Sequence, residues 1–243
     1  MGFEPIIHFM KEMHGKMNLN LGGTFQGSQS MQQVAYLRQL QRDMKKEETL
    51  LIPLNELDIV VFDIETTGFY PGQGDTILSI GAVKVSGGSI KEEDVFYSLV
   101  RYENPLTSEI QKLTGIDEMQ LRDAPLLADV LIDFFKFVRE LPLVAHHATH
   151  EKNFLQHASW KLFKAPFKHR IIDTSFLYRI ADPSMEHVTL EDCCEHNQIQ
   201  VKDRHHALGD AKLAAKLWCI YIPIIQKLGC ETLRDLYERL AKV

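Results

Sequence analysis

Two carboxylates stand two residues apart in the segment VVFDIETTG, where Asp63 and Glu65 follow an apolar run. Side chains alternate along a β-strand, so residues at this spacing project on the same side. If the apolar run is a strand, its end presents two converging carboxylates, whose oxygens are the ligands that hard divalent cations prefer. The alternative is a strand that runs into solvent with two solvated acids. The tight polar turn predicted by the following TTG favours convergence.

A histidine and a further carboxylate stand five residues apart in HHALGDAKLAAKL, as His205 and Asp210. Later residues of this segment, including Leu213 and Leu217, form the apolar face of a helix. This spacing places His205 at or just before the helix start and Asp210 more than one turn later, so both can face one cleft. A His and an Asp at a helix N-terminus are usually capping residues, so this pair alone does not define a site.

A third polar cluster lies in LVAHHATHEKNFL, which contains His146, His147, His150 and Glu151. His146 and His150 are four residues apart, a spacing at which two histidines on one helix can bind zinc. That arrangement requires the helix to have begun at His146, whereas LVAHH has the pattern of a strand end. The pattern therefore disfavours a zinc site.

Basic residues concentrate between positions 152 and 172, a stretch without Asp or Glu. Aromatic residues alternate with them, as in grooves that bind single-stranded nucleic acid by stacking its bases. The alternative is a helix with a solvated basic face and an aromatic core face, which suits Phe154 and Phe163 at least as well. The residues concerned are Lys152, Lys161, Lys164, Lys168 and Arg170, with Phe154, Trp160, Phe163 and Phe167.

From Leu57 onward the chain has the pattern of an α/β domain. LDIVVFDIE, TILSIGAVKV and DVFYSLV predict three strands, and the turn SGGS between the last two indicates an antiparallel meander. Helices are expected at about 107–114, 123–140 and 149–164, and strands in LPLVAHH and HRIIDTS. Further helices are expected over about 206–226 and 230–241. We predict an α/β fold with a mixed sheet flanked by helices.

Residues 1–56 form a separate N-terminal helical extension in this prediction, and residues 57–243 form the main domain. The extension contains a short apolar helix, the Gly/Ser-rich linker LNLGGTFQGSQS and a second helix over about Met31 to Glu48. The apolar face of the second helix would pack on the main domain or dock a partner, such as a replication or repair protein. That face consists of Met31, Val34, Leu37, Leu40 and Met44.

At 243 residues and 45% hydrophobic, the chain can bury a substantial core in one main domain. With 27 Lys plus Arg against 33 Asp plus Glu, its formal charge of -6 means that any polyanion would need a local positive field or bound cations. The four cysteines form no CxxC pair, and no apolar run reaches the length of about 20 residues that spans a membrane. We expect a cytoplasmic protein without a membrane partner.

Taken together, VVFDIETTG, KLTGI followed by DAP, LVAHHATHEKNFL, IIDTS and HHALGDA resemble the motifs of the DnaQ-like, or DEDDh, 3′-to-5′ exonuclease family. The resemblance covers Leu57 to about Leu228, in the family's order and approximate spacing, and is to the exonuclease domains of the DNA polymerase III epsilon subunit and PolC. It implies a ribonuclease H-like fold, with a five-stranded mixed sheet whose first three strands are antiparallel.

The resemblance also implies phosphodiester hydrolysis with two divalent ions, Mg²⁺ or Mn²⁺, about 3.5 to 4 Å apart. Asp63 would bridge both ions, Glu65 and Asp210 would complete the site of the nucleophilic water, and Glu151 would be the third metal carboxylate in chain order. These four residues are the expected metal ligands.

The general base implied by the resemblance is His205, a role that suits the near-neutral pKa of histidine. The neighbouring His206 is the alternative base, which the register of the HxALxD motif disfavours.

Substrate contacts are implied at two further places. The backbone around Ile64, Thr66 and Thr67 would approach the terminal nucleotide, and the segment LTGI would line the base pocket. From the residues alone, Gly115 equally predicts the C-cap of a helix. The substrate-binding candidates are Ile64, Thr66, Thr67, Leu113, Thr114, Ile116 and His147, and candidates for contact with the phosphate backbone are Lys161, Lys164, Lys168 and Arg170.

The third cluster departs from the family pattern LVAHNAxFDxxFL. Glu151 stands where the family has Asp, His147 where it has Asn and His150 where it has Phe. A glutamate can bind the same ions, but its longer side chain could displace the second metal, alter the metal preference or slow the enzyme.

The expected function is a 3′-to-5′ exonuclease that releases nucleoside 5′-monophosphates from the 3′ end of DNA, in proofreading or repair. One alternative is a 3′-to-5′ exoribonuclease, because the sequence does not settle the sugar. The other is a nucleic-acid-binding or scaffold protein whose catalysis is weakened by Glu151. The chain contains no polymerase or helicase motif, so we expect a stand-alone nuclease or a separate subunit.

Overall fold

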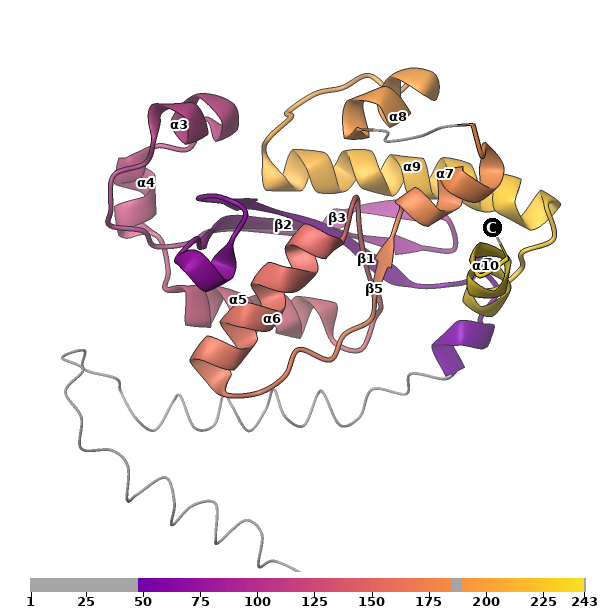
Figure 1. The fold of residues 1–243 in the computed structure, drawn as a ribbon, viewed down its shortest axis with the longest axis horizontal. Coiled ribbons are helices and arrows are strands. Elements are labelled where there is room, and N and C mark those ends of the chain that lie inside the picture. Colours follow the sequence, from indigo (N-terminus) through magenta and orange to yellow (C-terminus); the bar gives the residue numbers. More distant parts are fainter. Residues whose placement is uncertain (1–47, 185–188, 243) are drawn as a thin grey trace, which may run out of the picture. The chain divides into compact units, whose positions relative to one another are not determined.

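The computed structural model describes residues 48–184 and 189–242, which contain a five-stranded sheet with helices on both faces (Figure 1). The strands are β1 (Ile59–Thr66), β2 (Ile77–Ser86), β3 (Ser89–Leu99), β4 (Leu143–Ala145) and β5 (Ile171–Asp173). Their order across the sheet is β3-β2-β1-β4-β5. β1, β2 and β3 pair antiparallel, whereas β4 pairs parallel with both β1 and β5. The predicted fold class is confirmed.

The helices divide between the two faces of this sheet. α9 contacts β1, β2 and β3 along one face, and α5 packs against the other, where Phe134 meets Phe62 and Phe96 with ring centroids 5.6 Å apart. The helices in chain order are α3 (Ser108–Thr114), α4 (Glu118–Asp123), α5 (Leu127–Val138), α6 (Thr149–Phe163), α7 (Ser175–Ala181), α8 (Leu190–His196), α9 (Ala207–Lys227) and α10 (Leu233–Leu240), with 3-10 turns η1 (Glu48–Leu51) and η2 (Pro71–Gln73).

Alternation along β1 decides which side chains face α9. Ile59 and Val61 belong to the large core cluster with Leu213 and Leu217 of α9, whereas Phe62 packs on α5. Asp63 and Glu65 continue the first series, so they project on the α9 side of the sheet.

Two predicted elements differ in extent from the observed ones. The helix expected at 123–140 begins at Leu127 and is preceded by α4, because Pro125 holds Ala124 in an extended conformation with ψ 158°. The third strand begins at Ser89, before the predicted Asp94. Its polar first half is the exposed edge of the sheet, where charged side chains oppose pairing with other chains.

The predicted N-terminal helices and linker lie outside the described residues, apart from Glu48. The described chain packs on the domain before Leu57. Leu54 is fully buried, its N–H donates to the carbonyl of Glu231 at 2.8 Å, and Pro53 pairs with Thr232. None of the described helices is long and apolar enough to cross a membrane.

Candidate active site

Asp63 and Glu65 lie near the carboxyl end of β1 and face the side covered by α9. Glu65 is 9% exposed, and Asp63 is partly exposed. The strand therefore places both carboxylates at the boundary between the apolar core and solvent, as their spacing predicts.

Gly81 of β2 is paired with Asp63 and lets α9 begin directly over the strands. A Cβ at this position would lie 2.1 Å from the backbone nitrogen of Leu208 and 2.3 Å from the carbonyl carbon of Ala207. Only glycine allows this approach without a backbone shift. The role of Gly81 was not predicted, although a glycine inside an apolar strand is a signal of close backbone approach.

At the start of α9, the two adjacent histidines have different surroundings. His206 is the N-cap, and its ring stacks on Tyr97 with centroids 4.5 Å apart. His205 has φ 58°, and one of its ring nitrogens can lie within 4.8 Å of carboxylate oxygens of both Glu65 and Asp210. The structure thus brings the predicted base, His205, to the carboxylates and holds the alternative, His206, in a capping role.

Asp210 lies in the first turn of α9 and is 4% exposed. Its Oδ2 accepts a hydrogen bond from the backbone N–H of His205 at 3.1 Å and pairs with the guanidinium of Arg204. Arg204 also donates through Nε to Oε1 of Glu191 on α8 at 2.6 Å. Sequence analysis singled out neither Arg204 nor Glu191. The only signal in the sequence was a single basic residue, Arg204, directly before His205.

Glu151 reaches the same region from α6. It is 4% exposed, and α6 follows β4 after a turn over residues 146–148. Asp173, at the end of β5, accepts hydrogen bonds from the backbone N–H groups of His147 and Ala148, both at 3.1 Å. The role of Asp173 was not predicted, although it lies in the motif IIDTS.

The backbone of His147 explains why the family pattern has Asn there. Its φ is 54°, in the left-handed region, which Asn, Asp and His enter more readily than most residues. His147 is exposed and keeps the turn geometry that places Glu151. The substitution from the family pattern is therefore compatible with the local fold.

The other two histidines of this segment contact different groups. His146 lies in the turn, and its Nδ1 is 2.9 Å from the hydroxyl of Tyr178. Nε2 of His150 is 3.3 Å from Oγ1 of Thr66, and its ring meets Phe69. Since helix α6 begins only at Thr149, the pair lacks the helical spacing of a zinc site.

The clustered carboxylates favour protonated forms in the protein without cations. Burial raises the pKa of Glu65 to about 7, with the charge of Asp210 adding and that of Arg204 opposing. Burial raises the pKa of Glu151 to about 8, opposed by a backbone hydrogen bond, with the charges of Asp173 and Glu65 adding. The pKa of Asp63 is raised well above its usual range by burial and by three neighbouring carboxylates.

The residues fit a divalent cation. Glu65, His205 and Asp210 can each offer one ligand atom with all three atoms within 4.8 Å of one another. Oε2 of Glu151 and Oδ1 of Asp210 are buried and have no hydrogen-bond partner in the described part of the chain. Buried carboxylate oxygens without a donor are costly unless a cation or water satisfies them. Asp63 and Glu151 belong to no such close group of three among the described residues.

A pocket of about 380 Å³ opens beside these carboxylates. Arg204 and Glu191 form part of its wall, together with Asp63 of β1 and the turn after β4. It is lined by Asp63, His146, His147, Thr189, Leu190, Glu191, Arg204 and Asp210. A volume of this size is typical of a site for a small organic molecule.

The TTG turn after β1 is tied to the loop before β2. Thr67 donates to Asp75 at 3.3 Å and accepts from the N–H of Thr76 at 3.0 Å. Ile64 is 5% exposed, so its backbone rather than its side chain is available to a substrate.

LTGI forms the end of α3. Gly115 is the C-cap with φ 67°, as its alternative interpretation predicts. Leu113 is half exposed, whereas Ile116 lies in a small core cluster with Leu78, Leu106 and Leu121. Thr114 bonds to the carbonyl of Ile110. Leu113 is thus the member of the segment that can offer a large apolar contact.

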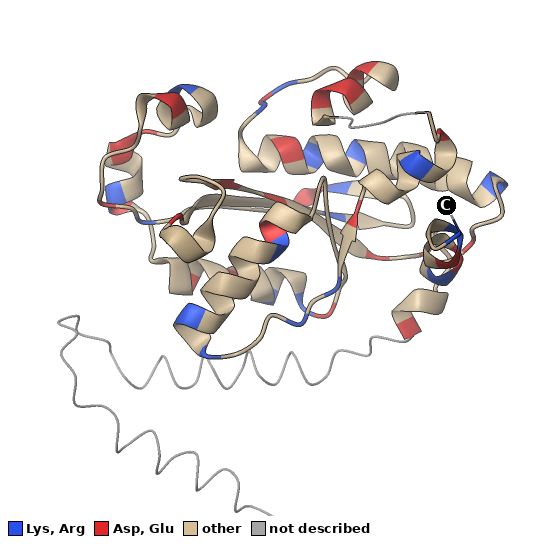
Figure 2. Cartoon of the chain, in the orientation of Figure 1, with Lys and Arg blue, Asp and Glu red and all other residues tan. Residues whose placement is uncertain are grey.

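The predicted basic stretch lies mostly away from the carboxylates. α6 carries Glu151 in its first turn, and its 15 residues span about 22 Å, so Lys164 and Lys168 follow the opposite end of the helix. Figure 2 shows basic bands at that end of α6 and along the loop to β5. Phe154, Phe163 and Phe167 are buried, whereas Trp160 is 61% exposed.

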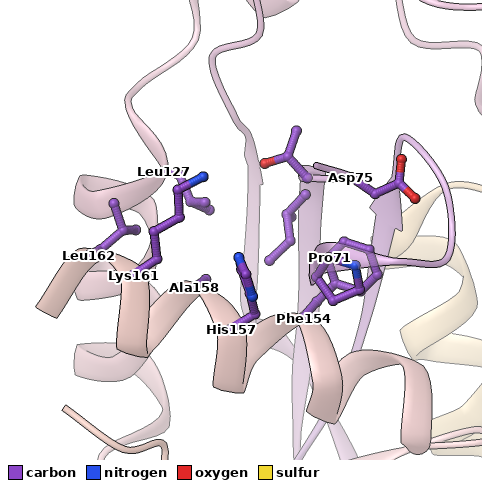
Figure 3. A pocket seen from close by; sticks show the side chains of 10 residues that line it. Pro71, Asp75, Leu127, Phe154, His157, Ala158, Lys161 and Leu162 are labelled. Atoms are coloured by element: carbon purple, nitrogen blue, oxygen red, sulfur yellow. The ribbon is translucent and has the colours of Figure 1, made fainter. Parts of the chain in front are cut away.

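A smaller cavity of about 80 Å³ lies between α6 and the loop before β2. Figure 3 shows His157, Lys161 and Phe154 on α6, with Pro71 and Asp75 across from them. This places Lys161, one of the predicted backbone contacts, at a cavity distinct from the carboxylate pocket.

Residues 60–218 match the family model described as exonuclease, RNase_T. The chain is 38% identical over 190 residues to the PolC-type DNA polymerase III of Bacillus subtilis, covering 78% of this chain and 13% of that protein. It is 32% identical over 182 residues to a DNA polymerase III subunit epsilon-like protein of Rhodobacter capsulatus, covering 74% of this chain and 26% of that protein. The chain thus spans about a quarter or less of the length of these relatives.

Solved structures show the same fold. The nuclease domain of 3′hExo, a DEDDh family member bound to rAMP, superposes with a TM-score of 0.59 at 25% identity, covering 72% of this chain and 94% of that chain. E. coli exonuclease I in complex with a dT13 oligonucleotide gives 0.59 at 14% identity, covering 71% and 43%. These likenesses confirm the ribonuclease H-like fold that the motifs imply.

Proposed function

The chain belongs to the RNase_T exonuclease family, and from this premise we propose that it is a metal-dependent 3′-to-5′ exonuclease that releases nucleoside 5′-monophosphates from the 3′ end of DNA. The observation that carries the proposal is the meeting of Glu65, His205 and Asp210 within 4.8 Å at the end of β1, beside Asp63. Glu151 contributes a fourth carboxylate from α6.

Two divalent ions, Mg²⁺ or Mn²⁺, would supply Lewis-acid activation of a water and stabilisation of the departing oxygen. Asp63, Glu65, Glu151 and Asp210 would hold them. His205 takes a proton from the attacking water, whose oxygen forms a bond to the terminal phosphorus. The bond from phosphorus to the 3′ oxygen of the preceding nucleotide breaks, this oxygen takes up a proton from solvent to become the new 3′-hydroxyl, and a nucleoside 5′-monophosphate leaves.

His205 suits the role of base because its neighbours fix it. Its own backbone N–H bonds to Asp210, and Glu65 lies close enough to stabilise the imidazolium that forms. The TTG backbone and Leu113 would hold the terminal nucleotide, and exposed His147 would lie at the entrance.

DNA is the preferred substrate because the two relatives above, at 38% and 32% identity, are DNA polymerase III proteins. RNA is the second candidate, supported by the likeness to the 3′hExo nuclease domain bound to rAMP. A weakened, nucleic-acid-binding scaffold is the third candidate, because Glu151 is one methylene longer than the family's Asp.

Residues 57–243 would be the exonuclease domain and residues 1–56 an extension that docks a replication or repair protein. Leu54 packs in the same core cluster as Leu57, which supports counting the residues just before Leu57 with the exonuclease domain. Deleting residues 1–47 should therefore leave nuclease activity intact and remove only partner binding.

The function is tested with 5′-labelled single-stranded DNA, 3′-recessed duplex and RNA, each incubated with Mg²⁺ or Mn²⁺. A ladder of shortened products that disappears in Asp63→Ala supports an exonuclease and ranks DNA against RNA. Asp133→Asn, which alters an exposed carboxylate on α5, is the control and should retain the ladder.

Glu151→Asp separates the scaffold candidate from the enzyme. A ladder from Glu151→Asp with none from the parent chain would support a protein weakened at residue 151. Inactivity of both the parent chain and Glu151→Asp on every substrate and metal would contradict the proposed function.

A further inference from the structure

Arg204 is the strongest cationic feature of the carboxylate pocket. Its side chain is 22% exposed and bridges two acids from different helices, Asp210 on α9 and Glu191 on α8. Asp210 is one of the proposed metal ligands. Arg204 therefore pairs with the same carboxylate that a cation would need.

The charge of Arg204 acts on more than its direct partners. It opposes the rise in pKa of Asp63, Glu65 and Asp210 that burial produces. A guanidinium can occupy two carboxylates at once because its donors form a planar fork. In the protein without cations, Arg204 thus supplies part of the positive charge that the cluster requires.

We propose that Arg204 is an internal counter-cation that competes with a divalent ion for Asp210 and that Glu191 retains its guanidinium when Asp210 is released. This inference rests on the proposed function, since it concerns the same metal ligands. Arg204 is a positioning residue here. It holds the carboxylate of Asp210 in place through Oδ2 without cations, and its positive charge opposes a divalent ion that binds the same carboxylate.

The two partners of Arg204 differ in burial, as the proposed competition requires. Asp210 is buried, with a side-chain exposure of 5%, whereas Glu191 is 43% exposed. Glu191 lines the pocket from α8. A guanidinium that leaves Asp210 can therefore stay paired with Glu191 at the pocket wall and need not enter solvent alone.

The test is the affinity of the full chain for Mn²⁺, measured by titration calorimetry and by electron paramagnetic resonance of free Mn²⁺. Arg204→Met should bind Mn²⁺ about tenfold more tightly, because a tenfold change in affinity corresponds to roughly the free energy of one charge-assisted hydrogen bond. Arg204→Lys keeps the charge but cannot bridge both acids, so it should also bind more tightly. Lys212→Met is the matched control, because it removes a positive charge on α9 that pairs with Glu92 outside the pocket.

Equal or weaker Mn²⁺ binding by both Arg204 variants, or an equal gain in Lys212→Met, would overturn the proposal while leaving the proposed function intact. Failure of the parent chain to bind any divalent ion would instead overturn the proposed function, and the inference with it.

A double-mutant cycle tests the part played by Glu191. Glu191→Gln should weaken Mn²⁺ binding in the parent chain and have little effect in Arg204→Met. Equal weakening in both backgrounds would mean that Glu191 acts only through its charge, which contradicts the retention of Arg204.

Thermal unfolding without cations gives an independent readout. Arg204→Met should unfold at a lower midpoint temperature than the parent chain, and added Mn²⁺ should raise its midpoint by more. If neither the midpoint nor its rise with Mn²⁺ differs from the parent chain, Arg204 is not a counter-cation.

Discussion

The two neighbouring histidines at the start of α9 have separate tasks. His206 caps the helix and stacks on Tyr97, while His205, with its left-handed backbone, faces Glu65 and Asp210. Asn is also a good N-cap residue and tolerates a left-handed backbone. Exchanging each histidine for Asn therefore tests the base without disturbing the helix start.

His205→Asn should lower kcat by about 10²- to 10⁴-fold, the usual contribution of a general base, whereas His206→Asn should keep most of the activity. The measurement is single-turnover cleavage of a 5′-labelled strand across a pH series. The parent chain should show a rise in rate with pH that His205→Asn lacks. Loss of that rise in His206→Asn instead would show that His206, and not His205, is the base.

Glu65 and Glu151 predict a pH dependence of stability in the absence of divalent ions. Their pKa values of about 7 and about 8 lie above the ordinary value of 4.5, so the folded state binds these protons more tightly than the unfolded state. The stabilisation is complete below the unfolded pKa and is lost as the pH rises through the folded pKa values. The free energy of unfolding should therefore fall between about pH 5 and pH 8.

Urea unfolding in the presence of a chelator, compared between the parent chain and Glu65→Gln/Glu151→Gln, isolates this contribution from other titrating groups. The parent should lose more stability across the window than the double variant, and added Mg²⁺ should reduce its loss. A parent chain that gains stability with pH relative to the double variant would contradict the assignment.

The grouping of individual residues at one site was predictable where residue type and spacing indicate it. Strand alternation placed Asp63 and Glu65 on one side, and the helix start placed His205 near Asp210, whereas Glu151 was implied only by the resemblance to the family motifs. Contacts that join distant segments have no such pattern. Asp173 bonds to backbone groups 25 and 26 residues earlier, and Arg204 meets Glu191 13 residues away.

At the scale of elements, the fold of the site depends on how closely α9 approaches the sheet. The antiparallel meander was predictable from the apolar strand runs and the SGGS turn, and the five-stranded mixed sheet was implied by the family resemblance, whereas the order of the strands was not predicted. The exposed α4 was not, because it is six residues long and buries only Leu121. The role of Gly81 was also not predictable from periodicity, because its neighbour Leu208 is 127 positions later in the sequence.

Gly81→Ala should displace the start of α9, because its Cβ would collide with the backbone of Ala207 and Leu208. A collision with backbone cannot be relieved by a rotamer change, so we expect a loss of stability of about 1 to 3 kcal/mol, as for other overpacked sites. His205 and Asp210 move with this helix start, so activity should fall further than stability alone explains. Chemical unfolding and cleavage assays measure both quantities.

Gly88→Ala is the control for a glycine with open space around it, since no heavy atom of the described chain lies within 4 Å of the position that a Cβ would take. Its φ of 70° carries a backbone cost, so it should lose some stability and keep its rate per folded molecule. An equal loss of rate in Gly88→Ala would show that Gly81 has no special role at the site.

At the scale of the whole molecule, the proposed function requires an acidic chain to bind a polyanion. The formal charge is -6, and the proposed site itself contains four carboxylates. The basic stretch at the far end of α6 was recognisable from composition alone. Its distance from Glu151 was not, because it follows from the direction in which α6 runs. A single-stranded nucleic acid with its 3′ end at the site would need to extend about 20 Å to reach Lys164 and Lys168.

Lys164→Glu/Lys168→Glu should therefore weaken the binding of a long single strand but not of a dinucleotide. Removing two phosphate contacts should also reduce the slope of log affinity against log salt by about 1 to 2. Lys216→Glu/Lys227→Glu on α9 is the matched control, because it makes the same change in net charge at two other exposed lysines. Binding is measured by fluorescence anisotropy with a chelator present to prevent cleavage. If both double variants weaken the long strand equally, net charge alone guides the substrate; if neither does at low salt, the stretch is a solvated surface.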